Sequence, residues 1–90
     1  MHIQLTAMRK SVNDKNYQDL LNYLKAARKE QDLTVRDVAA LIGENNQLVS
    51  KIENGNRKLS VSEYVQYCEG IGINPFEGLK LLCEYDWEEL

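Results

Sequence analysis

The chain has 90 residues, of which 43% are hydrophobic, and this is enough for one domain with a single core. No apolar run approaches the roughly 18 residues of a membrane span, and the opening MHIQLTAMRK lacks the basic-then-apolar order of a secretory signal. We therefore expect a cytoplasmic protein with no membrane partner. The formal net charge of −3 lowers the expectation of a polyanionic partner without excluding it.

The charge is unevenly distributed along the chain. Residues 1–30 carry six basic and three acidic side chains, residues 31–59 carry four of each, and residues 60–90 carry Lys80 against seven acids. Such a protein can still approach a polyanion if its acids lie away from the contact face, because salt screens exposed charges beyond about 10 Å.

The metal-ligating residue types are few and scattered. Cys68 and Cys83 stand 15 residues apart without a Cys-x-x-Cys pair, and the lone histidine is His2. We therefore expect reduced, structural thiols, no metal site and no cofactor.

Residues 1–12 show no helical periodicity, and the weak alternation of Ile3, Leu5 and Ala7 could indicate a short strand or an arm. We expect an N-terminal arm over residues 1–14. From Asn16 the pattern changes, and Asn16 followed by Asp19 resembles a helix cap. The first helix is predicted at about residues 15–31. Its apolar face consists of Tyr17, Leu20, Leu21, Leu24 and Ala27.

Thr34 with Asp37 three residues later predicts the start of a second helix. Gly43 ends it, because glycine adopts a left-handed conformation without steric cost. Asn45 then serves as the N-cap of a helix over about residues 46–53. The inward face of the second helix consists of Val35, Val38, Ala39 and Ile42.

The helix at 46–53 has a narrow apolar stripe, formed by Val49 and Ile52, so we expect most of it to be exposed. Asn54 and Gly55 stop it. Ser60 with Glu63 is a further capping box. It starts a helix over about residues 61–71, whose inward face consists of Val61, Tyr64, Val65, Cys68 and Ile71.

Asn74 and Pro75 predict a fifth helix, which continues to about Cys83 and precedes an acidic tail over residues 84–90. The pattern as a whole indicates five helices joined by short loops.

A set of residues spaced over a little over half of the chain, from Leu24 to about Pro75, matches one known pattern. It consists of Leu24, Arg28, Leu33, Thr34, Val38, Ala39, Ile42, Gly43, Val49, Ser50, Ile52, Glu53, Gly55, Ser60, Val61, Ile71, Gly72 and Ile73. In these residues the chain resembles the helix-turn-helix domain of the Xre, Cro and lambdoid repressor family.

The resemblance implies an all-α, compact five-helix lambda-repressor-like DNA-binding domain over residues 15–83, with its helix-turn-helix at 34–53. It also implies a sequence-specific transcriptional regulator, a repressor or autoregulator of phage or plasmid type, that binds double-stranded DNA at a pseudo-palindromic operator. The residues agree with this fold, because Ala39 allows two helices to cross closely and Val49 and Ile52 anchor the helix whose opposite face would enter the major groove.

The start of the helix at 46–53 would read bases. Asparagine and glutamine can pair with adenine, lysine can reach guanine acceptors, and leucine can contact a thymine methyl group. By resemblance, the base-contacting residues are Asn46, Gln47, Leu48 and Lys51. Leu48 draws attention as a leucine expected to be exposed on a polar helix.

Phosphate contacts would flank this helix, where amides and basic groups suit phosphate oxygens. The candidates are Asn45, Asn54, Asn56, Arg57 and Lys58. Arg28 and Glu53 match an arginine and a glutamate that the family commonly pairs, and we expect them to hold the helix at 46–53 in orientation rather than contact DNA.

The sequence departs from the family at two positions. Val35 stands where the family usually has a glutamine that binds phosphate, and Glu44 replaces a usually small or apolar residue beside the groove. Glu44 could instead lie over the positive N-terminus of the helix at 46–53.

The last helix and the tail offer more apolar surface than a small core needs. Either they complete the core, or they form a two-fold homodimer interface that would set two recognition helices roughly 34 Å apart. The candidate interface residues are Phe76, Leu79, Leu82, Cys83, Tyr85 and Trp87.

The alternative function is a protein-interaction module or antitoxin-like protein that keeps the fold. It would bind a protein partner through Val35, Leu48 and the acidic C-terminal tail. An enzyme is the least favoured class, because no His, Cys and carboxylate set converges and no phosphate-binding glycine loop is present.

Overall fold

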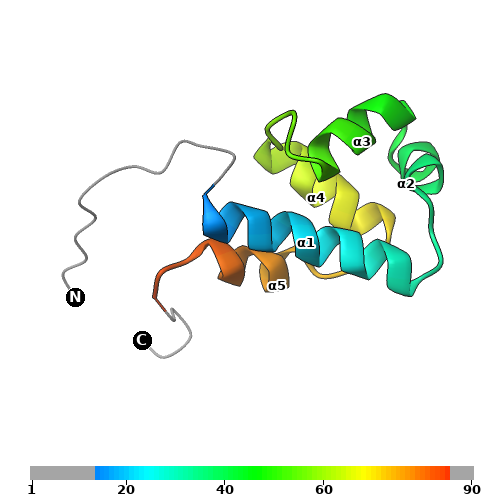
Figure 1. The fold of residues 1–90 in the computed structure, drawn as a ribbon. Coiled ribbons are helices and arrows are strands. Elements are labelled where there is room, and N and C mark those ends of the chain that lie inside the picture. Colours follow the sequence, from blue (N-terminus) through cyan, green and yellow to red (C-terminus); the bar gives the residue numbers. More distant parts are fainter. Residues whose placement is uncertain (1–13, 86–90) are drawn as a thin grey trace.

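The computed structural model describes residues 14–85 of the chain (Figure 1). The expected arm before Asp14, Trp87 and the end of the acidic tail lie outside the described residues. Residues 14–85 form five α-helices and one 3₁₀ turn and contain no strand, so the prediction of an all-α fold is confirmed. None of these helices is long and apolar enough to cross a lipid bilayer.

The first helix, α1, spans Lys15–Glu30. Its N-cap is Asp14, whose carboxylate accepts the backbone N–H of Tyr17 at 3.2 Å. The predicted start at about residue 15 agrees with the structure, but the expected cap at Asn16 is wrong. Asp14 offers a charged acceptor to the unpaired N–H groups of the first turn, and Asn16 lies inside the helix.

The next two helices, α2 (Val35–Ile42) and α3 (Asn46–Glu53), form the predicted hairpin. Thr34 and Asp37 cap α2 reciprocally, with hydrogen bonds of 2.8 and 3.0 Å. Gly43 ends α2 in the left-handed conformation at φ 72°. The Asn45 side chain accepts the backbone N–H of Leu48 at 2.8 Å and so caps α3. Local capping chemistry thus sets both ends of the hairpin turn.

The chain continues with α4 (Val61–Gly70) and α5 (Pro75–Leu79). Ser60 and Glu63 form the predicted capping box of α4. The fifth helix is shorter than expected: the α-helix ends at Leu79, a 3₁₀ turn η1 follows over Lys80–Leu82, and Cys83 has extended backbone. Tightening into a 3₁₀ turn is common where a helix ends.

The core lies where α1, the hairpin and α4 meet. Its buried hydrophobic residues are Leu20, Leu21, Leu24, Val38, Ala39, Val49, Ile52, Tyr64, Tyr67, Cys68 and Ile71. Tyr67 was not predicted to be buried. Val61 was predicted to face inward but is 78% exposed, because it is the first residue of α4 and extends beyond the elements that cover the rest of that face.

Close contacts fix α4 against its neighbours. A Cβ at Gly70 would lie 2.6 Å from Ile42 Cγ2, so α4 and α2 approach each other more closely there than a side chain would allow. The Tyr64 hydroxyl donates to the Pro75 carbonyl and joins α4 to α5. In the assembled fold, α1 lies between α3 on one side and α5 on the other, and α3 lies at the outer surface (Figure 1).

Candidate nucleic-acid interface

A buried ion pair holds α3 in place. Arg28 is 8% exposed and Glu53 is 6% exposed; Arg28 Nε and Nη2 donate to the two Glu53 carboxylate oxygens at 2.8 and 2.9 Å. Tyr67 Oη also donates to Glu53, at 2.5 Å, and Arg28 Nη1 donates to the Leu33 carbonyl at 2.8 Å. The expected pair of Arg28 and Glu53 is therefore present, and Tyr67 and Leu33 extend it.

The electrostatics of this network follow from burial and hydrogen bonding. The hydrogen bond to Glu53 raises the pKa of Arg28, and burial together with the adjacent Glu53 raises the pKa of Tyr67. Arg28 is therefore charged and Tyr67 neutral at physiological pH. With each partner satisfied, the network connects α1, α3 and α4 and fixes the orientation of α3.

The side of α3 that faces away from the core carries polar side chains, and the opposite side carries an apolar stripe that faces the core. Val49 and Ile52 are buried, while Asn46, Gln47 and Lys51 are exposed. This arrangement is the one that the narrow apolar stripe predicted. It leaves the start of α3 accessible to a partner.

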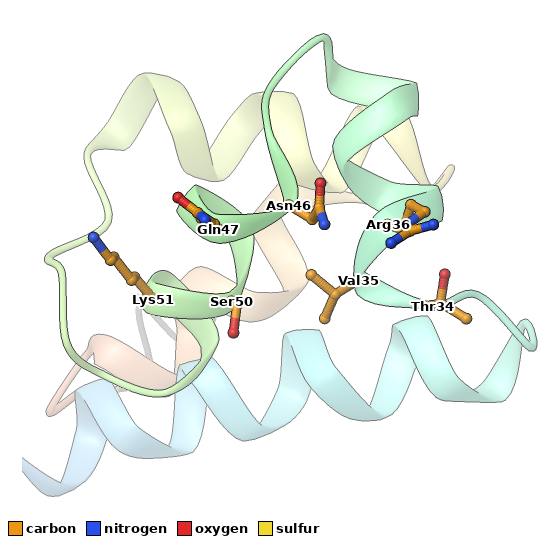
Figure 2. A pocket seen from close by; sticks show the side chains of 7 residues that line it. All are labelled: Thr34, Val35, Arg36, Asn46, Gln47, Ser50 and Lys51. Carbon is orange, nitrogen blue, oxygen red and sulfur yellow. The ribbon is translucent and has the colours of Figure 1, made fainter.

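A shallow depression lies between α3 and the start of α2 (Figure 2). Its lining residues are Thr34, Val35, Arg36, Asn46, Gln47, Ser50 and Lys51. Two of the seven are basic and none is acidic. Figure 2 shows the side chains of Arg36 and Lys51 near opposite ends of this surface.

Three of the lining residues were missed as site residues by the sequence reasoning. Thr34 and Arg36 come from the start of α2, and Ser50 lies one turn after Asn46 on α3. The helical spacing of Ser50 from Asn46 was available in the sequence. The contribution of Arg36 was not, because it depends on how α2 packs against α3.

Leu48 departs from its expected environment. It was expected to be exposed, but it is half-buried and does not line the depression. The position follows from helical geometry, since Leu48 is adjacent neither to Asn46 nor to Ser50 on the surface of α3. The expectation of an exposed leucine is wrong, and Leu48 lies beside the face formed by Asn46, Gln47 and Lys51.

The expected phosphate-contacting residues are all exposed around the ends of α3. They are Asn45, Asn54, Asn56, Arg57 and Lys58. Asn45 uses its side-chain oxygen to cap α3, and Asn54 donates to Ser50 Oγ at 3.3 Å.

Arg57 already has an acidic partner. Its guanidinium forms an ion pair with Glu63, with Nη1–Oε1 and Nη2–Oε2 distances of 2.9 and 2.8 Å. This hydrogen bond and the N–H of Ser60 lower the pKa of Glu63 to about 2. The pKa of Arg57 is raised by the same hydrogen bond, with a smaller contribution from Glu44. The sequence did not predict this ion pair.

Comparison with known proteins identifies the family of this domain. A helix-turn-helix family model matches residues 24–77, more than half of the chain. A solved structure, an XRE-family like protein from Pseudomonas syringae pv. tomato str. DC3000, shares 39% identity and a TM-score of 0.73 over 79% of this chain and 88% of that one. The chain belongs to the XRE helix-turn-helix family. At the level of this family it is a DNA-binding transcription regulator.

A second solved structure, of the clp gene regulator ClgR from C. glutamicum, has the same fold as this chain. ClgR and this chain share 20% identity and a TM-score of 0.63, over 71% of this chain and 84% of the ClgR chain. No protein of curated function matches the chain.

This chain also has an apolar surface, away from α3, which we call the α5–η1 face. Its exposed residues are Phe76, Leu79, Leu81, Cys83 and Tyr85. Leu82, also predicted here, is instead half-buried and packs against the core, and Leu81 takes an exposed position that was not predicted.

The two cysteines of this chain occupy different environments. Cys68 is buried, and burial raises the pKa of its thiol, as suits a structural residue. Cys83 is exposed, so it is not a core residue as Cys68 is. Within residues 14–85 no three His, Cys, Asp or Glu side chains gather as a metal site would require.

Proposed function

We propose that this protein is a sequence-specific regulator that reads the major groove with the exposed face of α3. The observation that carries the proposal is the depression between α2 and α3, which combines amides with two cations and contains no acid among its seven lining residues. The acidity of the chain lies mainly after residue 60, outside this surface. A duplex therefore meets a surface whose charge favours it.

Each side chain in the proposed contact has a defined chemical role. Asn46 and Gln47 present amides that can make paired hydrogen bonds to the N6 and N7 edge of adenine, and Lys51 can donate to the O6 and N7 acceptors of guanine. Leu48 remains a proposed contact at the margin of this face. Because α3 is held by the buried pair of Arg28 and Glu53, its backbone is already ordered, and binding costs only the freedom of the exposed side chains.

The phosphate contacts proposed around α3 come from exposed amides and from Lys58, which has no ionic partner within residues 14–85. Arg57 would contribute by exchanging its carboxylate partner for a phosphate or by sharing its guanidinium between the two. These contacts set the register of the protein on the duplex, and the base contacts supply sequence preference.

We further propose that two copies associate through the α5–η1 face and bind a pseudo-palindromic operator. Phe76 is 72% exposed, and the neighbouring apolar side chains extend this surface. A two-fold dimer would present two α3 helices to successive major grooves, roughly 34 Å apart. Binding near its own promoter would make the protein a repressor or autoregulator.

Fluorescence anisotropy with duplexes from upstream of the gene tests the proposal. We expect the binding constant to fall steeply with salt, with a slope of about −0.9 for each phosphate neutralised. Lys51→Ala should relax discrimination between the preferred duplex and base-substituted duplexes by roughly 5- to 100-fold, the value of one lost base contact.

Lys29→Ala is the matched control, because it removes the same charge from an exposed position on α1, outside both the depression and the α5–η1 face. It should leave discrimination unchanged. Equal, weak binding of the wild type to all duplexes at physiological salt would refute sequence-specific regulation.

A further inference from the structure

Val35 is the apolar member of the depression between α2 and α3. It is half-buried and packs against the core, yet it also lines the outer surface. Figure 2 shows its two methyl groups between the side chains of Asn46 and Ser50 on one side and Thr34 on the other. A β-branched side chain in a helix has one strongly preferred rotamer, so these methyl groups have a fixed position.

The polar groups around Val35 limit what can occupy this position. The Thr34 hydroxyl accepts the backbone N–H of Asp37 at 3.0 Å, so it is engaged in capping α2. Asn46, by contrast, is exposed, and no other residue within 14–85 uses its side-chain amide. An occupant must therefore place an apolar group on Val35 while offering hydrogen-bonding groups to Asn46.

The major-groove edges of the four bases differ in this respect. Thymine presents a C5-methyl group beside its O4 acceptor, whereas adenine, guanine and cytosine present only hydrogen-bonding groups. A phosphate placed on Val35 would lose hydration against its methyl groups, whereas the two cations of the depression, Arg36 and Lys51, lie near its opposite ends. Among the groups of a duplex, the thymine edge fits the surface best.

We propose that Val35 is a specificity-determining residue whose methyl groups contact the C5-methyl of one thymine, beside the base contacted by Asn46. The inference rests on the proposed DNA-binding function and extends the reading surface from α3 to the first turn of α2. It gives Val35 a role in choosing sequence rather than in binding the backbone. Because the contact joins Val35 to one methyl group of the DNA, it can be removed either by substituting Val35 or by removing that methyl group.

The test uses the full chain and the duplex that it enriches from a randomised library. Each thymine of that duplex is replaced singly by deoxyuridine, which removes only the C5-methyl group, and the dissociation constants are compared by anisotropy. At one thymine in each half-site, the wild type should bind the uracil duplex about fourfold more weakly, the loss expected when one methyl group is no longer buried.

Val35→Ala should bind the thymine and uracil duplexes equally at that position, and so should Val35→Gln. For each variant, the ratio of the two dissociation constants is measured with one protein sample. Any unfolded fraction affects both constants equally and cancels in the ratio. Val61→Ala is the matched control: Val61 is exposed on α4 and absent from the depression, and this variant should retain the fourfold ratio.

An undiminished uracil penalty in Val35→Ala would overturn the role of Val35 while leaving sequence-specific binding intact. The same holds if no thymine of the enriched duplex shows a methyl dependence in the wild type. Failure of the library to yield any preferred sequence would overturn both this inference and the proposed function.

Discussion

The ion pair with Glu63 changes what Arg57 can contribute to the proposed phosphate contacts. Glu63 closes the capping box of α4 and also pairs with Arg57, so a single carboxylate holds the start of a helix and the loop after α3. The loop therefore enters any DNA contact already ordered. Of its two basic residues, Arg57 is partly neutralised by Glu63, which should weaken its attraction for phosphate, and Lys58 is not.

The ionisation of Glu63 makes a testable contribution to stability. Its pKa is lowered from 4.5 to about 2 in the folded protein, first by Arg57 and then by the N–H of Ser60. Stability from this carboxylate is therefore present above about pH 4.5 and is lost as the pH falls towards 2. We expect Glu63→Gln to be less stable than the wild type by about 1 kcal/mol at pH 7 and equally stable near pH 2.

Urea unfolding at pH 7, 4.5 and 2.5 measures this difference. Glu69→Gln on the same helix serves as the control, because Glu69 is exposed and lies outside the capping box. A gap between Glu63→Gln and the wild type that stays constant down to pH 2.5 would show that Glu63 is not held ionised by these contacts.

At the scale of single residues, sequence pattern predicted the exposed polar face of α3 but not the surroundings of each side chain. Asn46, Gln47 and Lys51 line the depression, as an outward-facing surface should. Leu48 was misjudged because the polar composition of α3 suggested a solvent-facing leucine, whereas its position around the helix places it at the margin of the outward face, where it is half-buried. Arg36 was missed because only tertiary packing brings it beside α3.

At the scale of the elements, the buried network of Arg28, Glu53 and Tyr67 determines the orientation of α3. Removal of one charged partner should be far more costly than replacement of both, because the remaining charge is left buried and unpaired. We expect Arg28→Met to lose about 3 to 5 kcal/mol of unfolding free energy. The double variant Arg28→Met with Glu53→Met should recover most of that loss.

Chemical denaturation monitored by circular dichroism gives these free energies, and comparison of the denaturant slopes checks that unfolding remains two-state. Tyr67→Phe serves as an intermediate case: it removes the hydroxyl that donates to Glu53 but keeps the ion pair. A double variant as unstable as the single one would contradict the account of an uncompensated buried charge.

Helix boundaries were predicted best where a cap specifies them. The start of α2 at Thr34, its end at Gly43 and the start of α4 at Ser60 follow from short-range hydrogen bonds or backbone conformation. Periodicity was less reliable at the edges of the fold. Val61 has the spacing of a core residue, but no neighbouring element covers it. The early end of α5 similarly depends on packing beyond its local sequence.

For the whole molecule, α1 separates two surfaces with different composition. The polar depression lies on the α2 and α3 side, and the apolar α5–η1 face lies on the other. In the proposed dimer, this separation would let one protein associate with a second copy and with DNA without competition between the two. No acid lines the depression, so the negative net charge of the chain does not act at that surface directly.

The proposed dimer predicts the effect of a charge on the α5–η1 face. Phe76→Glu should convert a dimer to a monomer, because an ionised carboxylate would be desolvated in the interface, and DNA affinity should fall with it. Light scattering coupled to gel filtration measures the mass with and without operator DNA. Leu41→Glu, at an exposed apolar position on α2, is the control and should remain dimeric. A monomeric wild type, free and on DNA, would contradict the dimer.

We propose that α3 and the start of α2 together form the DNA-binding surface. Titration of the isotopically labelled full chain with its enriched duplex, followed by NMR chemical-shift mapping, locates that surface. We expect the largest shifts in residues 34–36 and 46–51, including the side-chain amides of Asn46 and Gln47, with small shifts for the helices on the far side of α1. Shifts concentrated in residues 76–85, with α3 unchanged, would contradict it.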